Sequence, residues 1–203
     1  MIELQIWGDF ECPFSYLQTI VLLKLKEKYK DKLMVCWKSY ELNVRENFSS
    51  PSPDYLESLR LAAKEHIAVD QQLRFLEPKT LPNIRIAQES VYFADTQNLS
   101  LEMAHAIFES FFDKNLDISD QTEILHIGAT VGLDIKNLND ALDDAIFTKR
   151  VAADEKEFAT LGFQAIPAML IGEKDFSPRS FQPITGYKTL EELETIISQI
   201  LKK

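Results

Sequence analysis

The sequence predicts an α/β protein whose sheet is assembled from two β-rich parts on either side of a block of helices. Three observations support this prediction. Residues 1 to about 45 have the pattern of a strand, a helix and a second strand. Residues from about 54 to 160 show helical periodicity almost throughout. The chain from Gly162 onward then returns to a strand, a short partner strand and a final amphipathic helix.

The first β-rich part begins with the apolar, β-prone residues 2–8, and Gly8-Asp9 marks the end of this strand. The following helix, through Tyr29, is apolar on nearly all sides at first and rich in lysine toward its end. This pattern indicates a helix with one end buried and the other in water. Residues 33–40 form the second predicted strand, with too little polar alternation for an exposed one.

The middle of the chain begins with a predicted linker from Asn47 to Asp54, which contains a Ser-Ser-Pro-Ser-Pro run. Helices are expected at roughly 55–68, 83–95, 100–113, 120–131 and 138–160. The segment Asn98-Leu99-Ser100 and Ser119 are candidate N-caps.

The second β-rich part reads as a turn followed by a buried strand over residues 165–172. Residues 180–184 are expected to form a short partner strand, and residues 189–201 a terminal amphipathic helix.

Composition narrows the function classes. A net charge of −10 over 203 residues argues against a nucleic-acid binder, because phosphate contacts supply most of that affinity. No apolar run approaches a membrane span, and the N-terminus lacks a signal-peptide pattern, so the expected location is cytoplasmic. Two cysteines do not make a disulfide framework, and the three histidines lack metal-ligand spacing. We therefore expect no metal site. Nothing in the sequence indicates the oligomeric state.

The most informative motif is Cys12-Pro13-Phe14-Ser15, at the predicted strand-to-helix turn. The free N–H groups and positive dipole of a helix N-terminus stabilise a thiolate, which is the reactive form of cysteine. Ser15 occupies the second position of what would otherwise be a CxxC redox pair. The structural alternative is a half-buried cysteine that packs as a small hydrophobe.

Three segments resemble the DsbA-like branch of the thioredoxin superfamily, closest to the FrnE-like oxidoreductases, kappa-class glutathione transferases and 2-hydroxychromene-2-carboxylate isomerases. The segments are the active-site turn at residues 9–17, the helical signature at 108–119 with Gly132-Leu133-Asp134, and the proline loop at 162–169. The likeness implies a thioredoxin-like fold with a helical domain inserted after the second strand. It divides the chain into a thioredoxin-like domain, residues 1–48 and 160–203, and an inserted helical domain, residues 54–159.

The resemblance also implies roles for particular residues. Cys12 would be the nucleophile, Ser15 its hydrogen-bond partner, and Pro13, Phe14, Ile166 and Pro167 the substrate-binding residues. It further implies a cis peptide bond before Pro167, a loop beside the cysteine, and a thiol or disulfide substrate. Without a second thiol at position 15, another thiol must resolve any mixed disulfide. Glutathione is the candidate co-substrate, and no tightly bound cofactor is expected.

Two questions stay open at this point. Ser15 favours the thiolate of Cys12, whereas the charges of Asp9 and Glu11 oppose it. Cys36 could be a resolving thiol, although its place in the second strand favours a buried, inert residue.

Three functions fit these residues. The leading hypothesis is a monothiol, glutathione-dependent thiol-disulfide oxidoreductase. The second is a glutathione-dependent isomerase or transferase of a small electrophile. The third is a redox-inactive binding module that has lost the resolving cysteine.

Overall fold

The computed structural model describes residues 1–42, 61, 76, 82–174 and 180–202. The predicted linker at 47–54 and the predicted helix at 55–68 lie outside these residues, apart from residue 61.

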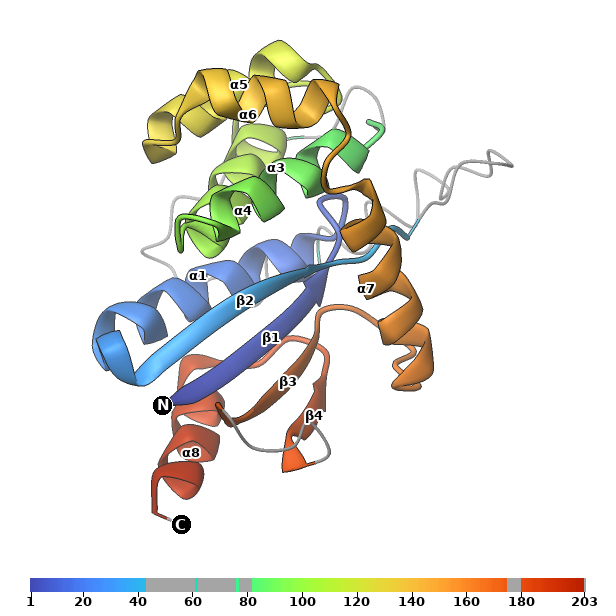
Figure 1. Cartoon of the computed structure of the whole chain (residues 1–203). Helices are drawn as coiled ribbons and strands as arrows, with labels where there is room; N and C mark the ends of the chain where they lie inside the picture. The colour runs from blue at the N-terminus through green and yellow to red at the C-terminus, as the bar shows by residue number, and fades with distance from the viewer. Residues whose placement is uncertain (43–60, 62–75, 77–81, 175–179, 203) are drawn as a thin grey trace.

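The framework is a four-stranded mixed sheet in the order β2-β1-β3-β4. The strands are β1 (Ile2–Gly8), β2 (Leu33–Ser39), β3 (Ala168–Glu173) and β4 (Gln182–Thr185). β1 pairs in parallel with β2, with Gly8 opposite Ser39, and antiparallel with β3, with Trp7 opposite Ala168. The two β-rich parts of the chain thus share one sheet, as the sequence predicts (Figure 1).

The helix α1 (Pro13–Tyr29) connects the two parallel strands and ends in a short 3₁₀ turn, Lys30–Lys32. Alternation along the strands sends side chains to two cores. Leu4, Ile6 and Val35 belong to the large core shared with α1 and the inserted helices. Trp7 and Leu170 belong to a smaller core that also holds Phe158.

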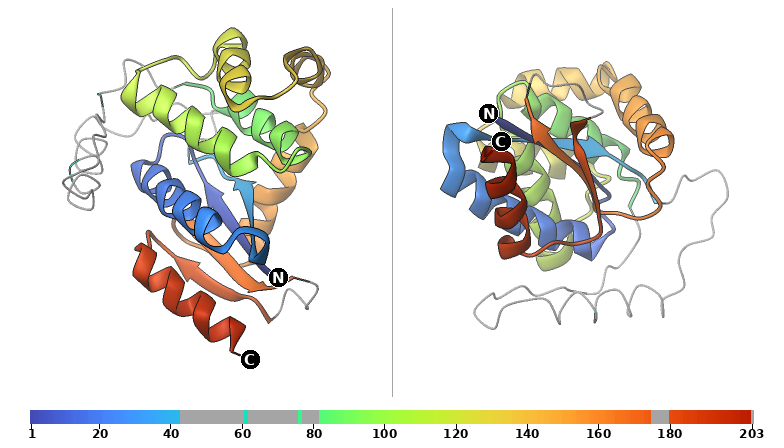
Figure 2. Two further views of the ribbon diagram at one scale, coloured as in Figure 1. Left: turned by 90° about the vertical axis from the view of Figure 1, so that its left-hand side faces the viewer. Right: turned by 90° about the horizontal axis from the view of Figure 1, so that it is seen from below.

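The remaining helices are α3 (Arg85–Asp95), α4 (Ser100–Phe108), α5 (Gln121–Val131), α6 (Ile135–Asp143), α7 (Thr148–Thr160) and α8 (Leu190–Leu201). Helices α3 to α6 form a group on the α1 side of the sheet, α7 packs against the C-terminal end of β2, and α8 lies against α1 (Figures 1 and 2). This arrangement confirms the predicted helical insertion after the second strand.

The predicted helix at 138–160 is wrong, because two helices occupy this region. α6 begins earlier, where the Asp134 side chain accepts from the Asn137 N–H at 3.1 Å. A turn at residues 144–147 then separates α6 from α7, and Ala145 has a φ of 50° there. This turn contains no proline or glycine, so the helical periodicity of the sequence continues through it and predicts one long helix.

The predicted helix at 100–113 changes its hydrogen bonding partway. α4 gives way to a π-helical turn at Glu109–Asp113. Of the candidate N-caps, the segment Asn98-Leu99-Ser100 contains the cap of α4, whereas Ser119 is not the cap of α5. The cap of α4 falls on Leu99, whose side chain accepts no hydrogen bond. The cap of α5 is Asp120, which accepts from the Thr122 N–H at 2.8 Å, whereas Ser119 donates to Asp117.

The terminal helix follows its prediction closely. Thr189 and Glu192 form a reciprocal capping box at its start. Among the residues described, no helix has the length and apolar character needed to cross a membrane.

Candidate functional site

Cys12 lies at the N-cap of α1, one turn beyond the end of β1. Its N–H donates to the Asp9 carbonyl at 3.0 Å, and its own carbonyl accepts from the Tyr16 N–H at 3.2 Å. Pro13 follows at the first helical position, where a missing N–H costs no hydrogen bond. The strand, tight turn and proline together place the thiol at the helix N-terminus, as the sequence predicts.

The environment of Cys12 does not favour the thiolate. The residue is only 5% exposed. Burial raises the pKa of its thiol above the ordinary value, and the nearby charge of Asp9 adds to this effect. Interactions with Ser15 and with the N–H of Phe14 lower the pKa of the thiol, but the effect of burial is larger and the net shift is upward. The expected thiolate stabilisation by the helix terminus is thus outweighed by loss of solvent, and the resting thiol is protonated at neutral pH.

Ser15 is completely buried in the first turn of α1. Its hydroxyl makes no regular hydrogen bond within the described part of the chain, but its closeness to the Cys12 sulfur lowers the pKa of that thiol. Pro13 is also buried, and Phe14 is partly buried against the large core.

Asp9 is a residue of this turn for which the sequence predicts only an opposing charge. Its fully buried carboxylate accepts from the N–H of Glu11 at 2.6 Å and from the N–H of Leu42 at 2.5 Å. These bonds shape the turn before Cys12 and attach it to the chain leaving β2. Burial and the charge of Glu11 nevertheless raise the pKa of Asp9 to about 8. An acidic residue that ends a buried strand is the pattern that could have indicated this role.

The Ile166–Pro167 segment approaches the same end of the sheet. The pairing of Trp7 with Ala168 places Pro167 beside Gly8, where the turn to Cys12 starts. The Ile166–Pro167 peptide bond is cis, and the Pro167 carbonyl accepts from the Gly186 N–H at 2.8 Å. Phe163 secures the preceding loop by packing against Trp7, with 5.6 Å between ring centroids.

The inserted helices pack against the first turn of α1 through buried aromatic side chains. The Tyr16 ring stacks with Phe108 and Phe112, at centroid distances of 5.4 and 5.7 Å. Its hydroxyl donates to Asp113 in the π-helical turn at 2.7 Å. The residue that follows Ser15 therefore connects the turn that carries Cys12 to the insertion.

Cys36 does not approach Cys12. It pairs with Gln5, three residues before the end of β2, and alternates with Val35 and Trp37, which face α1. Its side chain therefore lies on the opposite face of the sheet from α1. Burial and the charges of Glu3 and Asp95 raise the pKa of its thiol to about 11. Cys36 is partly exposed, where the sequence favours a buried residue, and its inert role stays a prediction.

Within the described part of the chain, no three His, Cys, Asp or Glu side chains form a group that could hold a metal ion. His105 contacts Thr19, with 2.9 Å between Nδ1 and Oγ1, at the junction of α1 and α4.

Comparison with solved structures supports this fold. A probable DsbA oxidoreductase from Streptomyces coelicolor superposes with a TM-score of 0.76 and 19% identity, covering 100% of this chain and 91% of the other. DsbM, a cytosolic disulfide reductase from Pseudomonas aeruginosa solved with GSH, gives a TM-score of 0.74 and 14% identity, covering 99% and 100%. A 2-hydroxychromene-2-carboxylate isomerase gives 0.71 and 16%, covering 98% and 96%.

Among curated proteins, no relative matched at a significant level. The DSBA-like thioredoxin domain, in contrast, matches residues 3–198. This match covers nearly the whole chain, from within β1 to within α8. The chain therefore belongs to the family of DSBA-like thioredoxin domains.

Proposed function

We propose that this protein is a thiol-disulfide oxidoreductase that uses Cys12 as its single reacting thiol. The observation that carries the proposal is the position of Cys12, at the N-terminus of α1 and next to the proline loop, in a DSBA-like domain. The substrate would be a disulfide on a protein or a small molecule. Pro13, Phe14, Ile166 and Pro167 would form its binding surface.

The reaction would proceed in two exchanges. The Cys12 thiolate attacks one sulfur of a substrate disulfide, forms a mixed disulfide and releases the other sulfur as a thiolate. An external thiolate then attacks the mixed disulfide and returns Cys12 to its thiol form. These two exchanges at Cys12 release one substrate sulfur as a thiol and the other as a mixed disulfide with the external thiol. A further exchange in solution, in which a second external thiolate attacks that mixed disulfide, completes reduction of the substrate and joins the two external thiols in a disulfide. We propose glutathione as the external thiol, since a related fold, DsbM, was solved with GSH.

The raised pKa of Cys12 supports the reducing direction. A stabilised thiolate makes a protein disulfide strongly oxidising, because reduction then yields a favoured product. The buried Cys12 thiolate lacks that stabilisation, which favours the disulfide-bonded state of Cys12. A thiol of high pKa is also a slow leaving group, so the mixed disulfide should be long-lived.

A second candidate is a glutathione-dependent isomerase. The same burial favours it, because a protonated Cys12 could donate a hydrogen bond to the glutathione thiolate and need not react. The similarity to 2-hydroxychromene-2-carboxylate isomerase is consistent with this alternative. Replacing Cys12 by serine separates the two, because the isomerase reaction would survive it and disulfide exchange would not.

The decisive experiment is intact-mass measurement after incubation with oxidised glutathione, using wild type, Cys12→Ala and Cys36→Ala proteins. We expect one glutathione adduct on wild type and Cys36→Ala, and none on Cys12→Ala. An adduct that persists in Cys12→Ala would refute the assignment. Absence of any adduct, also with small aliphatic disulfides, would favour a redox-inactive binding module.

Ser15→Cys provides the matched gain-of-function variant. The Ser15 side chain is buried and its hydroxyl lacks a regular hydrogen-bond partner among the described residues, so a thiol of similar shape should fit. It would resolve the mixed disulfide internally. The variant should therefore release bound glutathione and end as an intramolecular disulfide, whereas wild type keeps its adduct.

A further inference from the structure

A pocket lies at the opposite end of the sheet from Cys12. It has a volume of about 470 Å³ and opens beside the N-terminus of the chain and the first residues of β2. Leu33, Met34 and Val35 of β2 form its apolar side, and Asn98 and Ser100, at the start of α4, form part of the other. We call this the α4 pocket. Because Cys12 follows the far end of β1, the α4 pocket is separate from the thiol site.

The N-terminus of α4 presents free hydrogen-bond donors to this pocket. The helix has nine residues and no side-chain cap. The N–H of Met103 bonds to the Leu99 carbonyl, whereas the N–H groups of Ser100, Leu101 and Glu102 have no acceptor within the described chain. Such a terminus carries a partial positive charge and favours an anion.

Ser100 adds an independent observation. Its side chain lines the pocket and is only 3% exposed. Its hydroxyl makes no hydrogen bond to any described residue and is not fully enclosed, and the pocket is the hollow that Ser100 lines. A buried hydroxyl without a protein partner indicates a ligand or water in front of it.

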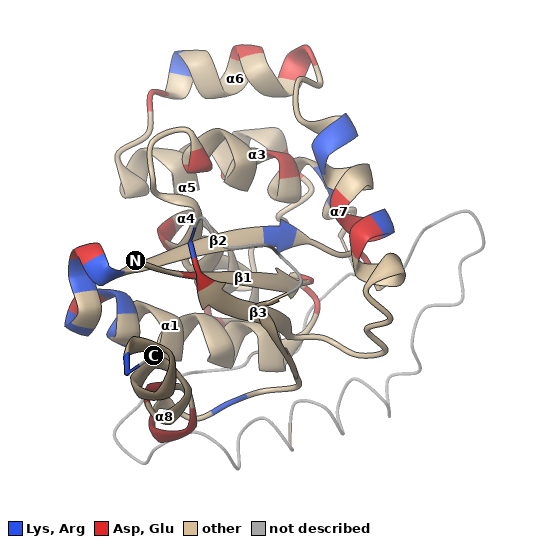
Figure 3. Cartoon of the chain, turned by 60° about the horizontal axis from the view of Figure 1, so that its bottom comes forward, with Lys and Arg blue, Asp and Glu red and all other residues tan. Residues whose placement is uncertain are grey.

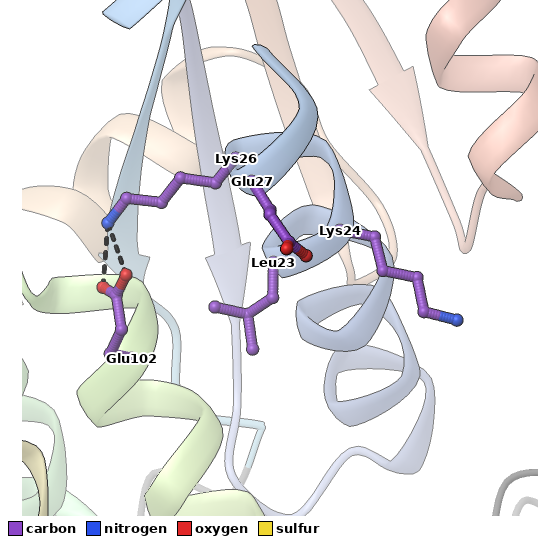
Figure 4. Close-up of a pocket in the computed structure, with 5 residues that line it drawn as sticks. All are labelled: Leu23, Lys24, Lys26, Glu27 and Glu102. Atoms are coloured by element: carbon purple, nitrogen blue, oxygen red, sulfur yellow. Dashed lines mark hydrogen bonds and ion pairs between the residues drawn. The ribbon is translucent and has the colours of Figure 1, made fainter. Parts of the chain in front are cut away.

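Charged side chains of both signs line the pocket, and lysines outnumber acids among the described residues there. The lining includes Lys26, Lys30, Lys174, Asp31 and Asp95. Two of these charges are already paired. Lys26 spans from α1 to Glu102, at 2.6 Å, at the border with a neighbouring hollow (Figure 4), and Asp95 pairs with Arg150 at 2.7 Å.

Among the described residues that line the pocket, Lys30 and Asp31 make no ion pair, and the Lys174 ammonium group donates only to the Met34 sulfur, at 3.8 Å. Figure 3 shows the basic end of α1 beside the N-terminus of the chain. Glu102, in the first turn of α4, is neutralised by Lys26, so it does not cancel the field of the helix terminus.

We propose that the α4 pocket binds a small organic anion, with its carboxylate or phosphate head at the N-terminus of α4 and its apolar body over Leu33 and Met34. The head would accept from the free N–H groups and the Ser100 hydroxyl, and Lys30 and Lys174 would balance its charge. The volume suits a ligand of this size. The inference does not depend on the thiol chemistry at Cys12.

The test is calorimetric titration of the full chain with phenyl phosphate, benzoate and inorganic phosphate, and with benzyl alcohol as the uncharged control. We expect one saturable site for phenyl phosphate or benzoate, weaker binding of inorganic phosphate and none of benzyl alcohol. The better of the two aromatic anions identifies the head group. Binding should weaken as salt rises, since the lysines of the rim are exposed to solvent.

Three variants locate the site. Ser100→Ala and Lys174→Gln should each weaken binding about fivefold or more, as for the loss of one hydrogen bond or charge contact to the anion. Lys24→Gln is the matched control, because Lys24 is an exposed lysine of α1 that does not line the α4 pocket. It should leave the affinity unchanged.

A second readout uses Cys36, which also lines the pocket. In the Cys12→Ala protein, saturating phenyl phosphate should slow alkylation of Cys36 at high pH. The proposal is overturned if neither aromatic anion binds at millimolar concentration, if inorganic phosphate binds as tightly as both, or if Ser100→Ala and Lys174→Gln bind like Lys24→Gln.

Discussion

Replacing Gln88 by leucine should destabilise the protein by about 3 kcal/mol. Gln88 lies on α3 and is fully buried. Its amide oxygen accepts from Trp37 Nε1 at 2.9 Å, and its amide nitrogen donates to the carbonyls of Gly8 and Tyr40 at 3.1 and 3.2 Å. One side chain thus connects the insertion to the ends of β1 and β2, where the turn to Cys12 begins.

The magnitude follows from the groups left without a partner. The Gly8 carbonyl also accepts from the Tyr40 N–H at 3.1 Å, so it stays satisfied. Trp37 Nε1 and the Tyr40 carbonyl lose the partner that Gln88 supplies. Each unsatisfied buried group costs about 1–3 kcal/mol, and the apolar leucine offsets about 1 kcal/mol of the total.

The assay is urea unfolding followed by tryptophan fluorescence, with Gln97→Leu as the matched control. Gln97 is exposed, and its change should alter the free energy of unfolding by less than about 0.5 kcal/mol. The slope with urea should be the same for all three proteins. A loss below about 1 kcal/mol in Gln88→Leu, or a loss equal to that of the control, would refute the reasoning. Faster alkylation of Cys12 in Gln88→Leu would show that the loosened strand ends expose the thiol.

Further predictions concern titrating groups. The rate of Cys12 alkylation should keep rising at pH values above the pKa of free cysteine, and Ser15→Ala should move this pH profile higher still, because Ser15 lowers the pKa of the thiol. A profile whose midpoint lies below the pKa of free cysteine would contradict this. Asp9 has a pKa of about 8 in the folded protein and therefore holds its proton there, so the free energy of unfolding should fall by a few kcal/mol as the pH rises from about 4 to 8. Thermal melts across that range should show a flatter pH dependence for Asp9→Asn. Burial lowers the pKa of His105, so protonation of this side chain opposes folding, and the free energy of unfolding should rise with pH through the range just below 6.5. In urea titrations at pH 5 and 7, His105→Gln should remove the part of this pH dependence that comes from His105.

The order of elements could be predicted from the sequence because local patterns determine it. The apolar runs of β1 and β3, the lysine-rich end of α1 and the capping box at Thr189 all depend on residues close in the chain. The break between α6 and α7 could not be predicted this way. It depends on Asp134 capping an earlier start and on a turn that contains neither proline nor glycine.

The position of the candidate site could also be predicted from the sequence, whereas the effect of its surroundings on the pKa of Cys12 could not. A cysteine between a strand and a helix can be found from the sequence alone. The sequence does not show that the turn around it is closed from solvent, that Leu42 donates to Asp9, or that Gln88 reaches Gly8. These contacts join residues from different elements, and only the folded chain brings them together.

The burial of Cys12 alters the usual argument for a thiol at a helix N-terminus. Helix dipoles and N–H groups lower a thiol pKa effectively when the sulfur also keeps contact with water or with a cation. Cys12 has neither advantage, because it is nearly enclosed and the ionisable neighbour that acts on its pKa, Asp9, is an acid that raises it. Its reactivity should therefore depend on events that change this enclosure, such as the docking of a partner against the proline loop. A thiol of this kind reacts slowly at rest and, once bonded to a partner, releases it slowly, which favours a reductase or a glutathione-binding enzyme over a DsbA-type oxidant.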